Sequence, residues 1–557
     1  MKKEKGKQVK EKRDGGFMSG VLILSLSTVI VKVIGLAYKI PMLSYLGAEG
    51  MGYFNSAYEI YALLCVISTA GLPVALSMLI AARRERDTQK QEAFGSIRRI
   101  YRSALCIFLI LGGGGTALML AFAKPISLWI GNEGAFLCVL AIAPALFCVC
   151  FSSAVRGYFQ GFHRMAPTAI SQLIEAFGKL IFGVWFASIA LKKGMDIPSV
   201  AAFAVLGLSL GTLLSSLYLF LLKAADPNRQ ERVSLIAEKE QPFSTLLRIA
   251  VPITVSSAVL NVTRLIDMTL IMRRLQTAGM SAAEANAIYG SYTTLAVPVF
   301  GLIPSLITPI SLALVPKLSA AIESRSREEE AMVTDRSIRV AVLFAMPASM
   351  GIAVYARPIL SLLFSGEEEA IAVAAPLLSL LGFSILFSGL ITTTNAILQS
   401  YRCTGKPILS MAVGAVVKIV TAYGLIGIPS VGVYGAPIST FFCNLTVTAM
   451  NFYFLGICVP KGQRVSGFFR VWCKPLAASS FAILGSLAVY LPMERWTENG
   501  TVAFLSAVVT AVLVYGIFAL LLRIVTEEDI ALLPMGTQLL NRWKHFGENR
   551  KKPRTDG

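Results

Sequence analysis

The sequence predicts an all-α integral membrane protein with about 14 transmembrane helices. Of its 557 residues, 55% are hydrophobic and 15% are charged, and the mean hydropathy is +0.67. The charged residues occur in clusters, and the apolar runs between them reach 20 or more residues. Such a run suffices to cross a hydrocarbon core of about 30 Å. We therefore expect lipid around most of the chain, because a soluble protein of this length would carry charged surface throughout.

The expected spans form two lobes of six helices each and a final helix pair. Each span is an apolar segment bounded by charges, proline or glycine. The segments are 17–43, 53–82, 100–123, 134–157, 167–191, 198–223, 246–272, 287–316, 337–361, 370–399, 408–428, 433–457, 470–491 and 501–523.

These spans divide the chain into six parts. The expected parts are a cytoplasmic basic tail (1–16), an N-lobe (17–223), a cytoplasmic connector (224–245), a C-lobe (246–458), a helix pair (469–523) and a cytoplasmic tail (524–557). For the last part, an amphipathic surface helix and a plain solvated tail both remain open.

A weak internal repeat supports the two lobes. The shared pattern is a glutamine, a basic loop, a proline that opens the next helix, and a lysine 11 or 12 residues later. It occurs at Gln160, Pro167 and Lys179 and again at Gln399, Pro407 and Lys418. Since six spans return the chain to the same side of the membrane, the two copies are predicted to be parallel.

The distribution of positive charge predicts the orientation. If the N-terminus is cytoplasmic, the predicted inside loops hold most of the loop lysines and arginines, and the outside loops hold far fewer. This is the positive-inside pattern, so both termini are expected in the cytoplasm. The same pattern explains the net charge of +19 without a nucleic-acid partner.

Catalysis and metal binding find little support in the sequence. Two histidines cannot build a histidine-based metal site, and the nine cysteines are scattered without a CxxC motif. No Walker motif, GxSxG or HExxH occurs, and no polar connector is long enough for an ATPase domain. We therefore predict a protein that is not an enzyme and that has no cofactor, with an ion gradient or the membrane potential as the driving force.

Ionisable side chains within the apolar segments are the candidate site residues. In lipid such a side chain costs several kcal/mol unless it faces a water-filled cavity or a partner. Lys32 and Lys39 lie seven residues apart and share one helix face, and Arg264 and Asp267 lie one turn apart. We expect a cationic cavity between the lobes, lined mainly by the first helix of each, that binds an anionic head group through Lys32, Lys39, Arg264 and Arg273. The residues expected to orient these groups or to take part in coupling are Glu59, Asp267, Glu175, Lys179 and Lys418.

Two alternatives stay open for these charges. Those near span ends, such as Lys39, Arg156 and Arg273, are equally explained by side chains that reach for the membrane surface. Glu175 and Lys179 have the favourable i,i+4 order within one helix, which favours a structural ion pair.

Glycine and proline mark three spans that are expected to bend or unwind beside a cavity. The alternative is that both residues are simply common in membrane helices. The positions are Gly71 and Pro73, the run Gly112–Gly115, and Gly301 with Pro298, Pro304 and Pro309.

Four segments resemble the stage V sporulation protein B family. They are STVIVKVIGLAYKIPML from Ser27, AEGMGYFNSAYEIY from Ala48, RGYFQGFHRMAPTAISQLIE from Arg156, and YGSYTTLAVPVFGLIPSLITPISLALVPKLS from Tyr289. That family is the polysaccharide-biosynthesis branch of the multidrug/oligosaccharidyl-lipid/polysaccharide (MOP) exporter superfamily. The resemblance covers roughly residues 17–525.

The resemblance implies a V-shaped fold of two lobes and transport of an undecaprenyl-diphosphate-linked sugar, with lipid II among the candidates. Related peptidoglycan flippases use arginines in the first helix; Lys32 has the equivalent position, and Lys39 lies one residue from the second. A lysine is a point charge and does not clamp a diphosphate as the planar guanidinium does. The identity of the head group therefore remains open, whereas its negative charge is expected.

The sequence thus predicts a monomeric flippase in the bacterial cytoplasmic membrane that moves its substrate by alternating access. The expected partners are a lipid-linked precursor, membrane lipid and proteins of cell-envelope synthesis. Two other functions remain open. An ion-coupled multidrug exporter of the same superfamily would favour cationic substrates and an acidic cavity. An envelope-assembly scaffold or an integral glycosyltransferase would need no transport cavity.

Overall fold

A computed structural model of the chain describes residues 2–86, 90–226, 242–459, 469–497, 499–522 and 524, and within these ranges it contains helices and turns but no strand. Twelve helical segments of this described part are long and apolar enough to cross a membrane. The protein is therefore all-helical and multi-pass. The predicted number of 14 spans stays a prediction. One segment, Leu26–Arg83, is 58 residues long and includes parts of the first two expected spans.

The helices form two compact units. Unit 1 comprises Met1–Thr294 and Ile426–Val433, and unit 2 comprises Leu295–Leu425 and Tyr434–Gly557. The predicted lobes instead divide at the connector 224–245, whose residues 227–241 lie outside the described part. The lobe boundaries and the two-lobe arrangement therefore stay predictions.

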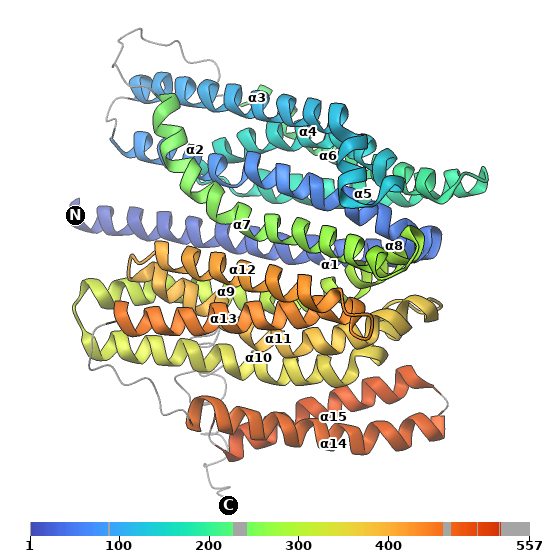
Figure 1. Cartoon of the computed structure of the whole chain (residues 1–557). Helices are drawn as coiled ribbons and strands as arrows, with labels where there is room; N and C mark the ends of the chain where they lie inside the picture. Colours follow the sequence, from blue (N-terminus) through green and yellow to red (C-terminus); the bar gives the residue numbers. More distant parts are fainter. Residues whose placement is uncertain are drawn as a thin grey trace, which may run out of the picture. The chain divides into compact units, whose positions relative to one another are not determined.

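Unit 1 is built from eight α-helices and a 3₁₀ turn, several of which Figure 1 labels. The elements are α1 (Lys2–Thr69), α2 (Gly71–Arg86), α3 (Lys90–Ile130), η1 (Glu133–Ala135), α4 (Phe136–Gly161), α5 (Ala166–Lys192), α6 (Ile197–Ala224), α7 (Pro242–Thr277) and α8 (Ala282–Ser291). The π-helix η3 (Tyr292–Ala296) begins in unit 1 and ends in unit 2.

The helix breaks follow the glycine and proline pattern in part. Gly47, with φ 65°, interrupts α1 between the first two expected spans, and α1 ends just before Gly71. In contrast, the run Gly112–Gly115 lies inside the continuous helix α3. Gly112 and Gly115 face Cys150 and Leu146 of α4, so this run serves helix packing rather than bending.

Glycines also bring α5 and α6 into close contact. A Cβ atom on Gly178 would lie only 2.6 Å from Cα of Gly211 on the neighbouring helix. Small residues that let two backbones approach are typical of helix pairs in membranes. This close approach holds α5, which carries Glu175 and Lys179, against α6.

Unit 2 contains seven α-helices and two short helical turns. They are α9 (Val297–Glu323), α10 (Arg327–Leu363), α11 (Glu368–Ser400), α12 (Gly405–Ile426), η4 (Gly432–Tyr434, which begins in unit 1), α13 (Gly435–Cys458), the π-helix η5 (Phe469–Cys473), α14 (Lys474–Thr497) and α15 (Gly500–Leu521). The predicted break between the segments 337–361 and 370–399 is present, because Gly366 takes φ 93° between α10 and α11. The helices α14 and α15 lie side by side as the expected pair (Figure 1).

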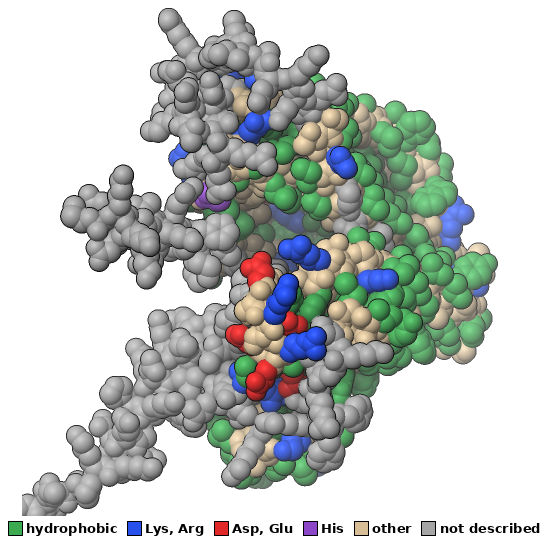
Figure 2. Space-filling view, turned by 90° about the vertical axis from the view of Figure 1, so that its left-hand side faces the viewer, with side chains coloured by type: hydrophobic (Ala, Val, Ile, Leu, Met, Phe, Trp, Pro, Cys, Tyr) green, Lys and Arg blue, Asp and Glu red, His purple; other side chains and the backbone are tan. Residues whose placement is uncertain are grey.

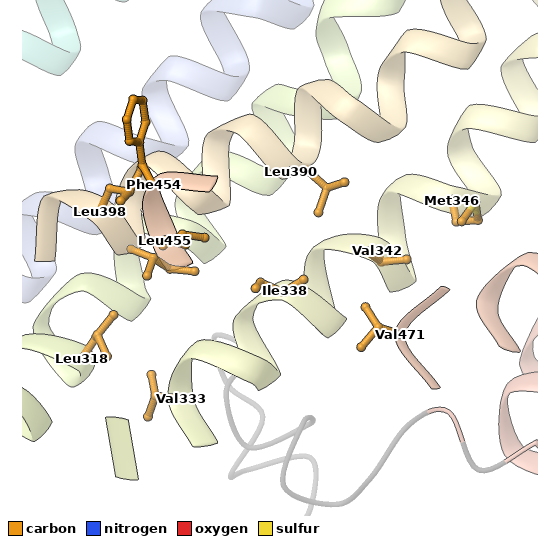
Figure 3. Close-up of a cluster of buried hydrophobic side chains, with 11 residues drawn as sticks. Leu318, Val333, Ile338, Val342, Met346, Leu390, Leu398, Phe454, Leu455 and Val471 are labelled. Carbon is orange, nitrogen blue, oxygen red and sulfur yellow. The ribbon is translucent and has the colours of Figure 1, made fainter. Parts of the chain in front are cut away.

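One core cluster of unit 2 consists of apolar side chains from α9, α10, α11 and α13 and of Val471 from η5, shown in Figure 3. Val342 and Leu390 are fully buried, and Ile338 is 2% exposed. Many large apolar side chains elsewhere are open, including Leu513 and Leu520 on α15 at 61% and 62%. Such exposure on a span is that of a lipid-facing surface. Hydrophobic side chains also cover much of the face in Figure 2, where the basic side chains form separate groups.

The two copies of the predicted repeat share one turn. His163 after α4 and Arg402 after α11 have left-handed φ values of 59° and 58°. In the first copy the amide of His163 donates to the Gln160 carbonyl and that of Arg164 to the Phe159 carbonyl. In the second, Arg402 donates to the Gln399 carbonyl and Cys403 to the Leu398 carbonyl. Both are Schellman caps, as are the turns at Gly131, Gly194, Gly279 and Arg325, so the repeat stays a prediction.

Candidate functional site

A polar cavity of about 550 Å³ lies within unit 1, between α1, α4, α5 and α7. Four basic side chains and one acidic side chain line it. These are Lys32 from α1, Arg156 from α4, Glu175 and Lys179 from α5, and Arg264 from α7. The sequence predicted Lys32 and Arg264 to face a hydrated chamber, and the structure places both on its wall. It also brings Glu175 and Lys179 there.

Arg156 is the most firmly held of the four basic groups. Its Nη2 lies 2.9 Å from Glu175 Oε2, and its Nε donates to the Ser171 hydroxyl at 2.9 Å. A further hydrogen bond runs from Nη2 to the Ser215 hydroxyl at 3.1 Å. The arginine therefore joins α4 to both α5 and α6, and Glu175 offsets its charge.

The expected i,i+4 ion pair between Glu175 and Lys179 is not the contact that forms. Glu175 pairs with Arg156, whereas Lys179 Nζ lies over aromatic rings. It is 4.9 Å from the ring centroids of both Tyr38 and Tyr58 and 5.6 Å from that of Phe54. Three ring faces stabilise an ammonium without neutralising it. The cavity thus retains the positive charge of Lys179.

Lys32 and Arg264 lie on the open side of the cavity. Both side chains are exposed, and both belong to the cavity wall. Lys32 lies in the membrane segment Leu26–Arg83, whereas α7, which carries Arg264, is not one of the twelve segments of the described part. With Glu175 paired to Arg156, the remaining charged groups on the wall are all positive. The arrangement can bind an anion, because several cations meet there and no carboxylate other than Glu175 lines the cavity.

Lys39 does not line this cavity. Its Nζ donates a hydrogen bond of 2.8 Å to the backbone carbonyl of Thr293 in η3. Lys39 follows Lys32 by seven residues along α1, but its ammonium group makes a contact between α1 and η3 instead. The sequence-based assignment of Lys39 to the anion site therefore has no geometric support here.

Arg273 is also held elsewhere, at the far end of α7. Its Nε donates to the carbonyl of Trp129 at the end of α3, at 2.7 Å. This tie between two helix ends matches the alternative reading of a charge near a span end. Glu59 and Asp267 are half-buried in unit 1 but are not part of the cavity wall, and Lys418 is half-buried on α12 in unit 2. Their roles in coupling stay predictions.

Sequence reasoning missed part of the site. Arg156 was read as an ambiguous charge near a span end, although the segment that begins with it carried one of the specific resemblances. The cavity wall also includes Tyr38, Tyr58 and Tyr61. Nothing in the local pattern separated these tyrosines from ordinary core aromatics, since Lys179, which lies over the rings of Tyr38 and Tyr58, comes from α5.

Among the described residues, no group of three or more histidine, cysteine or acidic side chains is placed to hold a metal ion. A second cavity, of about 660 Å³, lies within unit 2 between α10, α14 and α15. Its wall is apolar apart from a few hydroxyl groups such as those of Tyr355 and Tyr515, so it suits a hydrocarbon chain rather than a charged group.

The sequence matches known membrane proteins over most of its length. A family described as polysaccharide biosynthesis protein matches residues 17–322, and the MatE family matches residues 252–424. Stage V sporulation protein B of Bacillus subtilis (strain 168) is 26% identical over 541 residues, which cover 94% of this chain and 99% of that protein. Lipid II flippase MurJ of the same organism is 27% identical over 438 residues, covering 73% of this chain and 77% of that protein.

Solved structures show the same fold. A structure of lipid II flippase MurJ in an inward closed conformation aligns with a TM-score of 0.68 and 14% identity, covering 90% of this chain and 99% of that one. An inward-facing multidrug resistance MATE family transporter of the MOP superfamily aligns with a TM-score of 0.61 and 17% identity, covering 80% of this chain and 99% of that one.

Proposed function

The chain belongs to the polysaccharide biosynthesis protein family, within the MOP exporter superfamily, and from this premise we propose that it flips an anionic lipid-linked sugar precursor across the bacterial cytoplasmic membrane. Membership makes it a membrane flippase or exporter related to MurJ and to the MATE transporters. The proposal adds the substrate: a sugar carried on undecaprenyl diphosphate, with lipid II as one member of that class.

The observation that carries the proposal is the excess of positive charge in the unit 1 cavity. Lys32, Lys179 and Arg264 line it together, while Glu175 is engaged by Arg156. Lys179 is half-buried in the membrane segment Ala166–Lys192, and Lys32 is exposed in the segment Leu26–Arg83. A cation at such a position needs water or an anionic partner, and a diphosphate supplies negative charge and several acceptor oxygens.

The proposed transport cycle is alternating access without ATP. The head group binds the cationic cavity from the cytoplasmic side and leaves on the outer side, and the polyprenyl chain stays in lipid. The membrane potential or an ion gradient supplies the driving force, because one charge moved through 100 mV is worth about 2.3 kcal/mol. Both termini are placed in the cytoplasm, the chain acts as a monomer, and no catalytic step is assigned to it.

A second candidate function is ion-coupled export of drugs. The match of residues 252–424 to the MatE family favours it. Drug exporters that prefer cations need an acidic binding site, however, and Glu175 is the one carboxylate on the described cavity wall. The excess of positive charge in the cavity therefore favours the lipid diphosphate over a cationic drug as the substrate.

Ligand binding to the purified full-length protein separates the two candidates. We expect undecaprenyl diphosphate to raise the thermal unfolding temperature and undecaprenol to raise it far less. The stabilisation should be lost in Lys32→Gln/Arg264→Gln and kept in Arg99→Gln, which changes an exposed arginine that does not line the cavity. Stabilisation by a lipophilic cation, with none by the diphosphate, would instead establish the drug exporter.

A further inference from the structure

A second group of basic side chains surrounds a separate groove of about 330 Å³ in unit 1. The groove lies between α3, α4 and α6, and its basic members are Arg98, Arg102 and Lys223. None of these residues lines the cavity assigned to the transported substrate. The groove therefore needs its own explanation, and that explanation does not depend on which substrate is carried.

All three helices place this groove at the same end of unit 1. Arg98 and Arg102 lie near the start of the membrane segment Ser96–Ile130, and Lys223 lies at the end of the segment Ile197–Ala224. Tyr158, another wall residue, lies three residues before the end of Glu133–Gly161. The basic groups thus lie at the depth of lipid head groups. By the predicted orientation, this end is cytoplasmic.

One acidic residue, Asp226, offsets part of the positive charge of the groove. Asp226, whose side chain is 1% exposed, accepts a hydrogen bond from the Tyr158 hydroxyl at 2.9 Å and lies 3.3 Å from Lys223 Nζ. Lys223 also lies 3.6 Å from the centroid of the Tyr158 ring. Arg164 Nη1 also lies 3.8 Å from Asp226, so this one negative charge is shared between two cations. Lys223 is therefore fixed in position, and its positive charge is offset in part.

The two arginines of α3 supply the remaining charge. Arg98 and Arg102 are four residues apart, so they project from the same face of α3, and both are exposed. Among the described residues, no ion-pair partner is found for either guanidinium. Two like charges at this spacing repel each other, and an anion between them removes that repulsion.

The rest of the wall is apolar. Leu105 of α3, Phe151 of α4 and Phe220 of α6 continue from the basic end into the membrane-spanning part, and Phe220 is 54% exposed. A ligand that fits both parts has an anionic phosphate and a hydrocarbon chain. Basic pockets between transmembrane helices on the cytoplasmic side bind anionic lipid head groups in this way.

We propose that this groove binds an anionic phospholipid of the surrounding membrane, with its phosphate between Arg98 and Arg102 and an acyl chain along Phe151 and Phe220. Lys223, held by Asp226 and Tyr158, closes the phosphate site from α6. The bound lipid would join α3 to α4 and α6 and so stabilise unit 1.

The test measures lipid retention and thermal unfolding of the full-length protein after delipidation. The probes are phosphatidylglycerol and phosphatidylcholine with the same acyl chains, and inorganic phosphate alone. We expect phosphatidylglycerol to be retained and to raise the unfolding temperature, and the other two probes to have little effect. An arginine near an anionic lipid surface contributes about 1 kcal/mol, so Arg98→Gln/Arg102→Gln should bind phosphatidylglycerol roughly thirtyfold more weakly.

Matched variants make the result decisive. Arg99→Gln removes the same charge from the next position of α3, outside the groove, and should retain the lipid. Arg98→Lys/Arg102→Lys keeps both charges and should recover most of the binding. If the glutamine variant fails to fold, Phe220→Gln provides the test, and it should weaken phosphatidylglycerol binding. Equal loss in Arg99→Gln, equal retention of phosphatidylcholine, or full stabilisation by inorganic phosphate would each overturn the proposal.

Discussion

The ammonium nitrogen of Lys39 donates a hydrogen bond of 2.8 Å to the backbone carbonyl of Thr293. Thr293 lies in the π-helix η3, whose wider turns depart from the regular α-helical pairing of carbonyls. Asn55 of the same helix α1 donates to the hydroxyls of Thr293 and Thr294 at 3.0 and 2.8 Å. These bonds tie α1 to the start of η3 within unit 1, so Lys39 is a structural residue.

Replacing Lys39 by methionine should therefore lower stability. The change keeps the length of the side chain but leaves the Thr293 carbonyl without its donor, at a cost of about 1–3 kcal/mol. Thermal unfolding of the purified protein measures this, with Lys32→Met as the control that should unfold close to the wild-type temperature. A Lys39→Met protein of normal stability that no longer binds undecaprenyl diphosphate would show instead that Lys39 belongs to the anion site.

Replacing Glu175 by glutamine should have opposite effects on stability and on anion binding. Arg156, 13% exposed, would lose its ionic partner, and an uncompensated charge in this position should cost up to about 3 kcal/mol. The cavity would at the same time become more positive, so undecaprenyl diphosphate should bind several times more tightly. Calorimetry and a thermal unfolding scan measure the two quantities. Weaker diphosphate binding in the Glu175→Gln protein would contradict a cationic cavity.

The ring of Tyr58 should matter for binding, and its hydroxyl should not. Tyr58→Leu removes one of the three ring faces near Lys179, and such a contact is worth about 0.5–2 kcal/mol. We expect diphosphate binding to weaken severalfold in Tyr58→Leu and to stay near the wild-type value in Tyr58→Phe. Equal losses in the two variants would show that the hydroxyl, rather than the ring face, acts on the ligand.

The close contact of α5 and α6 predicts a steep difference between two glycine substitutions. Gly178→Val should push α5 away from Gly211 and cost several kcal/mol, because the obstructing atoms belong to the backbone. Gly113→Ala, in the interior of α3, has no atom within 4 Å of the added carbon and should be neutral or slightly stabilising. Unfolding temperatures of the two variants compare these effects. A Gly178→Val protein with the wild-type unfolding temperature would show that α5 and α6 separate without loss of stability.

Much of the fold was predictable from the sequence because the membrane constrains it strongly. Apolar length indicated many membrane-crossing helices, and the described part has twelve candidates; the break at Gly366 follows from glycine in a turn. The helix ends differ in places, because α1 continues past the expected loop at 44–52 with a kink at Gly47 and ends inside the expected span 53–82. The grouping of α7 and α8 into unit 1 did not follow, because hydropathy carries no information about which helices pack together. The Gly112–Gly115 run misled for the same reason: its role depends on the facing helix α4.

The site was predictable in its charge and less so in its contacts. Lys32 and Arg264, chosen for their depth in apolar segments, both lie on the wall of one cavity, and their binding of an anion stays a prediction. The partner of Glu175 was missed because spacing along a helix favours Lys179, while Arg156 reaches it from α4. Lys39 and Arg273 are ionisable residues of apolar segments, as Lys32 is, yet each donates a hydrogen bond to a backbone carbonyl.

Translocation of undecaprenyl-diphosphate-linked sugar in proteoliposomes tests the central claim, that the unit 1 cavity binds the transported head group. Wild type and Arg273→Gln, whose arginine lies outside the cavity, should translocate the lipid at similar rates. The translocation rate of Lys32→Gln/Arg264→Gln should fall at least about tenfold, which corresponds to about 1.4 kcal/mol. Translocation by this double variant at the wild-type rate would contradict the account.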